Sequence, residues 1–146
     1  MSHLNLAQTG WLAGMIDGEG CINLQEKFVA NTKRSLIYQL SLGIRMTHEL
    51  TISKIFKLAS TGRLDSPRIH PGNRKVSHCW IANGKEALFV LNLVKEHLVT
   101  KREQMLLAFR FGEIYPIDRR GEISEEVQLE VKSIYNKLAD LNYRGI

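Results

Sequence analysis

Two carboxylates lie close together near the start of the chain, in the glycine-rich segment 17–20. The preceding residues 4–16 have apolar side chains at helical spacing, so these carboxylates come at the end of a predicted helix. The last carbonyls of a helix lack helical partners, and the glycines let the backbone turn sharply there. A carboxylate beside such carbonyls makes an oxygen site suited to Mg²⁺, which combines few protein ligands with water and phosphate. The alternative is an ordinary helix end with a solvated turn, in which Asp17 forms structural hydrogen bonds.

The same predicted helix carries the small residues Ala13 and Gly14. Small side chains let a second helix approach closely along that face. Two copies of the chain that met there would bring two Glu19 carboxylates together, and their repulsion would favour a divalent cation. In a homodimer that pairs in this way, Ala13, Gly14 and Asp17 would lie at the interface.

Hydrophobic periodicity and turn residues predict the elements that position these groups. Capping patterns at Asn83 with Glu86 and at Thr100 with Glu103 predict the starts of two helices. The fold class is α+β, in a single domain over residues 1–146 without a repeat of the first helix. The predicted elements are helix 4–16, strands 21–28 and 39–47, helix 49–59, a hairpin of 63–70 and 75–82, helices 83–98 and 100–112, and a last helix at 124–141.

Each long predicted strand has one apolar and one polar face. Amide, guanidinium, hydroxyl and carboxylate groups read base edges in a major groove, and a two-stranded ribbon fits that groove. In the second hairpin, alternation places Cys79 and Ile81 inward and His78 and Trp80 outward. The alternative is an ordinary solvated sheet face. The predicted DNA-reading face consists of Gln25, Lys27, Gln39, Ser41, Arg45, Arg63, Asp65, His78 and Trp80, with Lys33, Arg34, Arg74 and Lys75 beside it on phosphates.

Positive charge is concentrated in the segment that contains the predicted strands. Residues 21–82 hold ten lysine and arginine residues against three acidic residues, a local balance of +7, whereas the whole chain carries +5. A basic sheet suits a polyanionic partner, because neutralised phosphates release counterions. Many proteins with a mild basic excess bind no nucleic acid, so the charge alone does not decide the function.

Residues 12–20, Leu-Ala-Gly-Met-Ile-Asp-Gly-Glu-Gly, resemble the LAGLIDADG motif of homing endonucleases. Met15 and Glu19 are close substitutions, and Gly18 is common at its position in that family. The resemblance covers about residues 4–112 and is to the short homodimeric members, which leaves 113–146 as a C-terminal helical extension. It implies an αββαββα core with a saddle-shaped antiparallel sheet.

The resemblance also implies roles for individual residues. The last acidic residue of the motif binds metal in the family, which implies Glu19 as a ligand with the Gly18 carbonyl, and Mg²⁺ or a substituting Mn²⁺ as cofactor. Lys101 begins a run similar to the segment that places a basic residue near the scissile phosphate; the alternative is a solvated lysine at a helix start. His48 follows the long strand, where the family often has a polar residue that orders active-site water. The alternatives are that His48 acts as a base or is a helix N-terminal residue.

The activity implied by the resemblance is staggered double-strand hydrolysis of DNA at a long, nearly palindromic site, as in intron or intein homing. A maturase that assists RNA splicing and a non-cleaving DNA-binding regulator are the alternatives. The presence of both Glu19 and Lys101 argues against the regulator, whereas a basic sheet serves DNA and RNA equally.

The sequence also predicts where the protein works. No run approaches the ~18 apolar residues that a membrane span needs, so no membrane partner is predicted. Cys21 and Cys79 have no metal-ligand spacing, which is typical of a reduced intracellular protein. An organelle (chloroplast or mitochondrion) and a microbial cytoplasm are both compatible with these features.

Overall fold

The computed structural model describes residues 4–28, 36–72, 75–115 and 123–143. The helices are α1 (Leu6–Glu19), α2 (Glu49–Ala59), α3 (Lys85–Val94), α4 (Arg102–Ile114) and α5 (Glu125–Asn142). The strands are β1 (Gly20–Phe28), β2 (Leu36–Met46), β3 (Arg63–Leu64) and β4 (His78–Asn83). This order confirms the predicted α+β class and the succession of elements.

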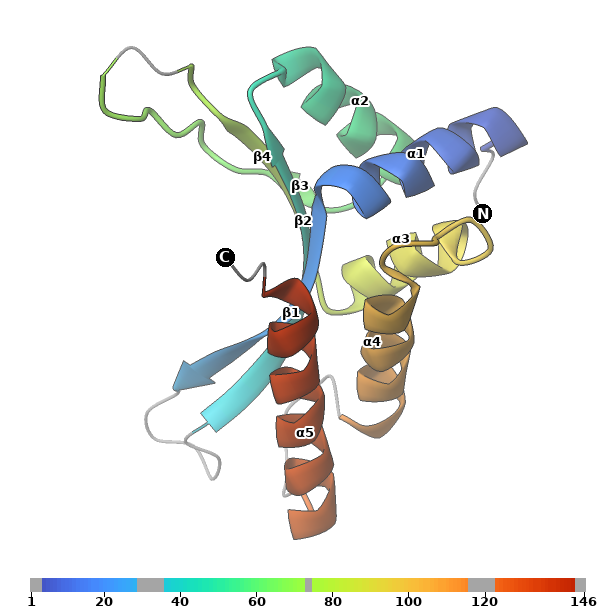
Figure 1. Ribbon diagram of the computed structural model, residues 1–146, viewed down its shortest axis with the longest axis vertical. Helices are drawn as coiled ribbons and strands as arrows, with labels where there is room; N and C mark the ends of the chain where they lie inside the picture. Colours follow the sequence, from blue (N-terminus) through green and yellow to red (C-terminus); the bar gives the residue numbers. More distant parts are fainter. Residues whose placement is uncertain (1–3, 29–35, 73–74, 116–122, 144–146) are drawn as a thin grey trace.

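The four strands form one antiparallel sheet in the order β1-β2-β4-β3. Figure 1 shows the helices packed along one side of this sheet, with α1 leading directly into β1. Apolar side chains from neighbouring strands are in register on the helix-covered side, for example Ile22 opposite Leu42 and Leu42 opposite Ala82. All three of these side chains are buried, so this side of the sheet forms the hydrophobic core.

The second hairpin corrects the predicted DNA-reading face. Trp80 pairs with Ile44 and is fully buried, and its indole Nε1 donates a hydrogen bond to the Thr61 carbonyl oxygen at 3.0 Å. His78 pairs with Met46 on the same side. The prediction that His78 and Trp80 face outward is therefore wrong. β4 has apolar residues on both faces, so either Trp80 or Ile81 could face the core. Burial of the indole contributes more free energy than burial of Ile81, because more apolar surface is removed from water.

Helix starts also differ from the capping patterns. α3 begins after Gly84 and ends at Val94, and the Glu86 carboxylate accepts hydrogen bonds from the Thr61 hydroxyl at 2.9 Å and the Gly62 N–H at 3.2 Å. Glu86 therefore fixes the loop after α2 and does not close a capping box. The predicted strand 63–70 is reduced to the two residues of β3, followed by an isolated bridge between Arg68 and Ser77.

The last helix packs against β1 and α4 and adds to the core. Its Val131, Ile134 and Leu138 are buried in the same cluster as the sheet residues. Glu26, the charged residue on the apolar face of β1, pairs with Lys132 of α5 at 2.9 Å, which explains how a carboxylate is tolerated there.

None of the helices in the described ranges is long and apolar enough to cross a membrane.

Substitution of two glycines can test how tightly the turn between α2 and β3 packs against β4. Gly62 and Gly72 both have positive φ, at +86° and +80°. A Cβ on Gly62 would lie 2.6 Å from Trp80 Nε1 and 2.7 Å from the Ile81 carbonyl oxygen, whereas a Cβ on Gly72 meets nothing within 4 Å. We predict that Gly72→Ala lowers the free energy of unfolding by about 1–2 kcal/mol, the cost of the left-handed backbone.

Gly62→Ala should cost about 1–3 kcal/mol more than this control, because the added methyl group overpacks the indole. Urea denaturation of both variants measures the difference. Equal losses for the two variants would show that the turn does not pack tightly against Trp80.

Candidate active site and nucleic-acid interface

Glu19 is the last residue of α1, and its side chain is exposed. The chain passes directly from the helix into β1 at Gly20, whose N–H donates to the Ile16 carbonyl oxygen. A Cβ on Gly20 would lie 2.7 Å from that oxygen, so this sharp junction requires glycine. The predicted metal ligands Glu19 and Gly18 are both exposed at this end of α1, where the chain enters the sheet.

Asp17 performs the structural role that was one of its two interpretations. Its carboxylate accepts hydrogen bonds from the backbone N–H groups of Val99 at 2.9 Å and Lys101 at 3.0 Å. These N–H groups lie at the start of α4, where helical partners are missing. The predicted Thr100 cap is wrong: the residue at the N-cap position is Lys101, and its side chain makes no capping hydrogen bond. The Asp17 carboxylate instead holds the backbone of the segment that leads into α4. Asp17 is engaged within its own protomer.

Lys101 reaches the end of α1 in the opposite direction. It is only 7% exposed, and its Nζ donates a hydrogen bond to the Asp17 carbonyl oxygen at 2.8 Å. A cation in this position compensates the negative end of the α1 dipole. Lys101 is therefore not a solvated lysine, and its ammonium lies at the helix end that carries Glu19.

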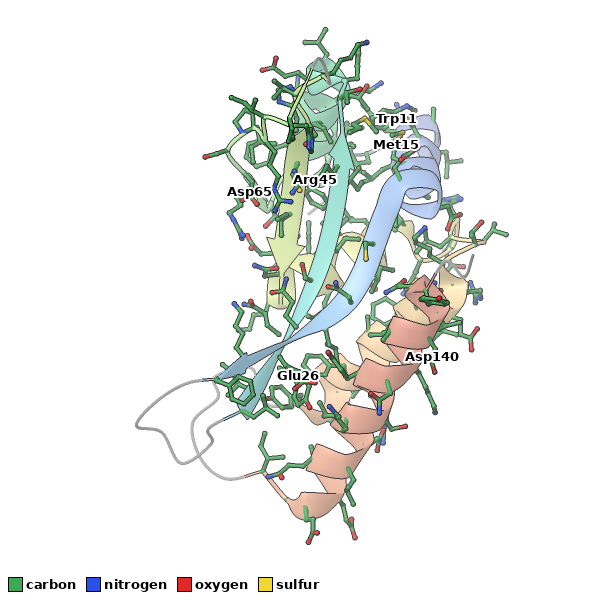
Figure 2. The ribbon with its side chains drawn as sticks, turned by 60° about the vertical axis from the view of Figure 1, so that its left-hand side comes forward. Trp11, Met15, Glu26, Arg45, Asp65 and Asp140 are labelled. Atoms are coloured by element: carbon green, nitrogen blue, oxygen red, sulfur yellow. The ribbon has the colours of Figure 1, made fainter. Side chains whose placement is uncertain are left out.

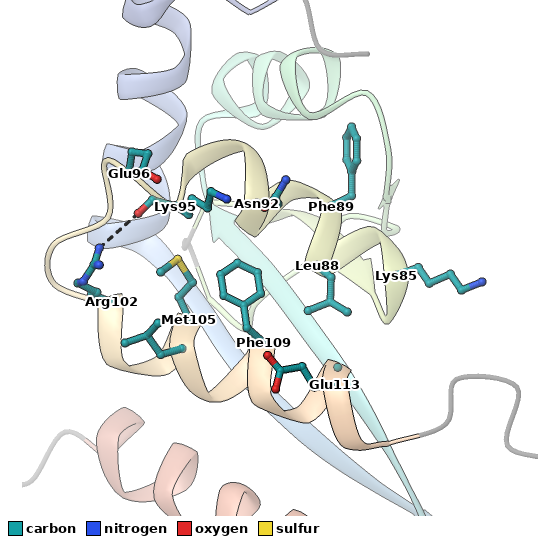
Figure 3. A pocket seen from close by; sticks show the side chains of 12 residues that line it. Lys85, Leu88, Phe89, Asn92, Lys95, Glu96, Arg102, Met105, Phe109 and Glu113 are labelled. Atoms are coloured by element: carbon teal, nitrogen blue, oxygen red, sulfur yellow. Dashed lines mark hydrogen bonds between the residues drawn. The ribbon is translucent and has the colours of Figure 1, made fainter.

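Arg102, the next residue, points elsewhere. Its Nη1 donates to the Lys95 carbonyl oxygen at 3.5 Å, and it lines a groove of about 690 Å³ between α3 and α4, as Figure 3 shows. Leu88, Met105 and Phe109 also line this groove. Arg102 thus belongs to a different surface from Lys101.

His48 is the N-cap of α2. Its Nδ1 accepts a hydrogen bond from the Thr51 N–H at 3.2 Å and lies 2.7 Å from the Thr51 hydroxyl oxygen. This confirms the interpretation as a helix N-terminal residue. Ordering of water by His48 stays a prediction.

The exposed face of α1 differs from the predicted interface at one residue. Ala13 is 2% exposed and belongs to the protomer's own core, so its side chain is unavailable to a second helix. The face that remains open carries Gly10, Gly14 and Gly18, and a Cβ on any of them would meet nothing within 4 Å. These glycines are four residues apart and therefore follow one side of the helix.

The donor set at this helix end fits half of a magnesium site. Within the described ranges, no three His, Cys, Asp or Glu side chains gather closely enough to hold a metal ion. One chain offers the Glu19 carboxylate and backbone carbonyls, and Mg²⁺ commonly takes one or two carboxylates with water and phosphate. A second copy of the chain and a phosphate would complete such a site.

The open side of the sheet carries most of the predicted DNA-reading residues. Rows of polar side chains cross the strands here: Asn23 pairs with Ser41 and Ser41 with Asn83, and Gln25 pairs with Gln39. Figure 2 shows Arg45 and Asp65 near one end of this surface. Gln25, Lys27, Arg63 and Lys75 are exposed, Gln39, Arg45 and Asp65 are half-buried, Ser41 is buried, and Lys33, Arg34 and Arg74 lie outside the described residues.

Around Cys79, charged groups gather that the sequence analysis only partly identified. Burial raises the pKa of the Cys79 thiol, Asp65 raises it further, and the guanidinium groups of Arg45, Arg63 and Arg68 oppose the rise. Arg63 and Asp65 form a salt bridge at 3.1 Å. Arg68 was missed because Pro67 interrupts the strand alternation on which the prediction relied.

The chain is similar to known proteins in its three-dimensional structure. No protein-family model and no curated protein matches the sequence. The structure is similar to the homing endonuclease I-CvuI in complex with its target, with a TM-score of 0.78 and 20% identity over 97% of this chain and 87% of that chain. It is also similar to the archaeal intron-encoded homing endonuclease I-Vdi141I complexed with DNA, with a TM-score of 0.77 and 13% identity over 96% and 87%.

A third similar structure is the LAGLIDADG homing endonuclease I-LtrWI bound to target DNA, with a TM-score of 0.71 and 22% identity. There the match covers 94% of this chain but only 45% of the other. These similarities show that the chain has the fold of the LAGLIDADG homing endonucleases, as its motif predicted. They cover nearly the whole chain and so extend beyond the predicted range 4–112.

The two acidic residues at the end of α1 form a matched pair for a stability test. Asp17→Ala removes the acceptor for two backbone N–H groups, and we predict that it lowers the free energy of unfolding by about 1.5–3 kcal/mol. Glu19→Ala alters an exposed side chain and should stay within about 0.5 kcal/mol of the wild type. Urea denaturation distinguishes the two, and similar losses would mean that Glu19 also supports the fold.

Proposed function

We propose that this chain is a LAGLIDADG homing endonuclease that acts as a homodimer and cleaves both strands of a long DNA site. The main support is the end of α1, which carries the exposed carboxylate of Glu19 and whose Asp17 carbonyl accepts a hydrogen bond from the buried lysine Lys101. The end of this helix leads into a sheet whose open face carries amides and guanidinium groups. A carboxylate for a metal, a cation for a phosphate and a surface for base edges are thus joined in one fold.

The incomplete site and the open glycine face of α1 support the proposed dimer. One chain supplies one motif carboxylate, and Gly10, Gly14 and Gly18 leave room for a second helix. The match to less than half of I-LtrWI supports the same conclusion, since this chain has the size of half of that protein. A twofold dimer would recognise two related half-sites, which accounts for a nearly palindromic target.

Mg²⁺, or Mn²⁺ in its place, would be held by the Glu19 carboxylate and the adjoining backbone carbonyl of Gly18. Bound there, the cation would neutralise phosphate charge and lower the pKa of a bound water. Lys101 would place a second positive charge near the scissile phosphate, on a side chain that the Asp17 carbonyl already orients. Asp17 itself keeps α1 and α4 in fixed positions.

DNA would bind on the open sheet face, with Gln25, Gln39 and Arg45 toward base edges and Lys75 toward phosphate. Lys33, Arg34 and Arg74 remain predicted phosphate ligands. The staggered geometry of the cut, intron or intein homing, and an intracellular location in an organelle or a microbial cytoplasm are further parts of the proposal.

Glu19→Gln tests the catalytic role. This variant keeps the size of the side chain and removes the charge that would hold the metal, so we predict that cleavage falls by at least about 10²-fold. The substrate is a duplex from the intron-less form of the host gene, and cleavage is followed with Mg²⁺. Binding of the same duplex with Ca²⁺ should stay within a few-fold of the wild type, which separates catalysis from recognition.

Lys101→Met should slow cleavage less than Glu19→Gln, because it leaves the metal ligand in place. Undiminished cutting by Glu19→Gln would place the catalytic carboxylate elsewhere. A wild-type protein that binds the duplex but never cuts it with Mg²⁺ or Mn²⁺ would favour the maturase or the regulator.

Gly14→Leu tests the dimer. The position is exposed and open, so leucine should leave the protomer folded while it forces a second helix away. Light scattering should give twice the 16.7 kDa monomer mass for the wild type and the monomer mass for this variant. Ala139→Leu adds the same side chain at an exposed position on α5 and should leave the dimer intact. A wild-type monomer, even with DNA, would remove the basis for paired Glu19 residues.

A further inference from the structure

Arg45 on the open sheet face forms a chain of three polar residues with Ser77 and His70. Its Nη1 donates a hydrogen bond to the Ser77 hydroxyl oxygen at 3.4 Å, and the same oxygen lies 3.0 Å from Nε2 of His70. Ser77 is only 5% exposed, whereas Arg45 is half-buried and His70 partly exposed. The three residues come from β2, from the residue before β4 and from the segment that runs opposite it.

The backbone holds Ser77 firmly in this position. Its N–H donates to the Arg68 carbonyl oxygen at 3.0 Å, and its carbonyl oxygen accepts from the Arg68 N–H at 3.0 Å. A serine hydroxyl can accept a hydrogen bond from a guanidinium and donate one to an unprotonated histidine nitrogen at the same time. A buried hydroxyl loses water as a partner, so both neighbours matter for its orientation. Ser77 is thus a fixed acceptor for one N–H of Arg45.

The other groups near Arg45 leave its remaining donors available. Cys79 is directly opposite Arg45 in the register, and its raised pKa keeps the thiol neutral. Asp65, which directly follows β3, is paired with Arg63 at 3.1 Å. A guanidinium carries five N–H donors, and one contact with Ser77 leaves enough for a bidentate contact.

We propose that Ser77 and His70 are positioning residues for sequence recognition: they orient Arg45 so that its remaining N–H groups meet the O6 and N7 acceptors of a guanine in the major groove. An arginine that is oriented before binding loses less rotamer freedom when it docks on a base. This inference rests on the proposed function, because it requires that the open sheet face binds DNA. It adds two residues that make no direct contact with the base.

The test measures base preference, which a merely structural role would not change. The protein, with Ca²⁺ to prevent cutting, selects duplexes from a randomised pool, and the guanine whose preference disappears in Arg45→Ala is identified. Arg45→Ala should reduce discrimination for that guanine about 10- to 100-fold. Ser77→Ala should reduce it about two- to tenfold at the same base, and His70→Ala should act in the same direction.

The double variant Arg45→Ala with Ser77→Ala should discriminate no worse than Arg45→Ala alone, because Ser77 acts through Arg45. Ser77→Thr keeps the hydroxyl and should retain the preference. Ser41→Ala is the matched control: this serine lies on the same face and is 7% exposed, close to the 5% of Ser77. Its effect should add to that of Arg45→Ala.

The possible failures are distinguishable. Wild-type protein that selects no sequence would overturn the proposed function and this inference together. If the wild type selects a site and Arg45→Ala changes the preference, but Ser77→Ala weakens binding to all duplexes equally, the inference alone fails. Ser77 would then support only the fold, and thermal unfolding of Ser77→Ala and Ser77→Thr would show the corresponding loss and recovery of stability.

Discussion

The mutual hydrogen bonding between the end of α1 and the start of α4 is the interaction on which the candidate active site depends. The Asp17 carboxylate accepts from two N–H groups before α4, and Lys101 returns a hydrogen bond from its ammonium to the Asp17 carbonyl. Residues more than eighty positions apart are thereby locked together. Asp17, one acidic residue of the motif, stabilises the fold, whereas the other, Glu19, is exposed. The two carboxylates differ in role because the backbone donors lie on only one side of the helix end.

This arrangement also explains which parts could be predicted from the sequence. Strand alternation correctly gave the polar face of β1 and β2, because long half-buried strands have a clear period of two. The motif correctly placed Glu19 at an open helix end. The role of Lys101, which came from a second run similar to the family, stays a prediction. The sequence could not show that Asp17 binds the backbone before α4 or that Ala13 lies in the core, because both depend on which helices pack beside α1.

The errors in β4 have a related cause. His-Cys-Trp-Ile-Ala-Asn offers apolar side chains to both faces, so its alternation alone does not select the buried side. Pairing with β2 selects it, and Trp80 goes to the core while Cys79 goes to the open face. The charged groups around Cys79 follow from that choice, and so does the contact of Arg45 with Ser77. The proposed recognition of DNA by this face thus depends on how β4 pairs with β2 in the folded protein.

The most direct test of this account is the structure of the protein bound with Ca²⁺ to a duplex that it selects. In this complex we expect two protomers related by a twofold axis that passes between their α1 helices. Both Glu19 carboxylates would then coordinate divalent ions beside phosphates of opposite strands, with the open sheet faces in the major groove. A complex in which Glu19 lies far from every phosphate and metal ion, or in which a single protomer binds the whole site, would contradict a catalytic site built from two Glu19 residues.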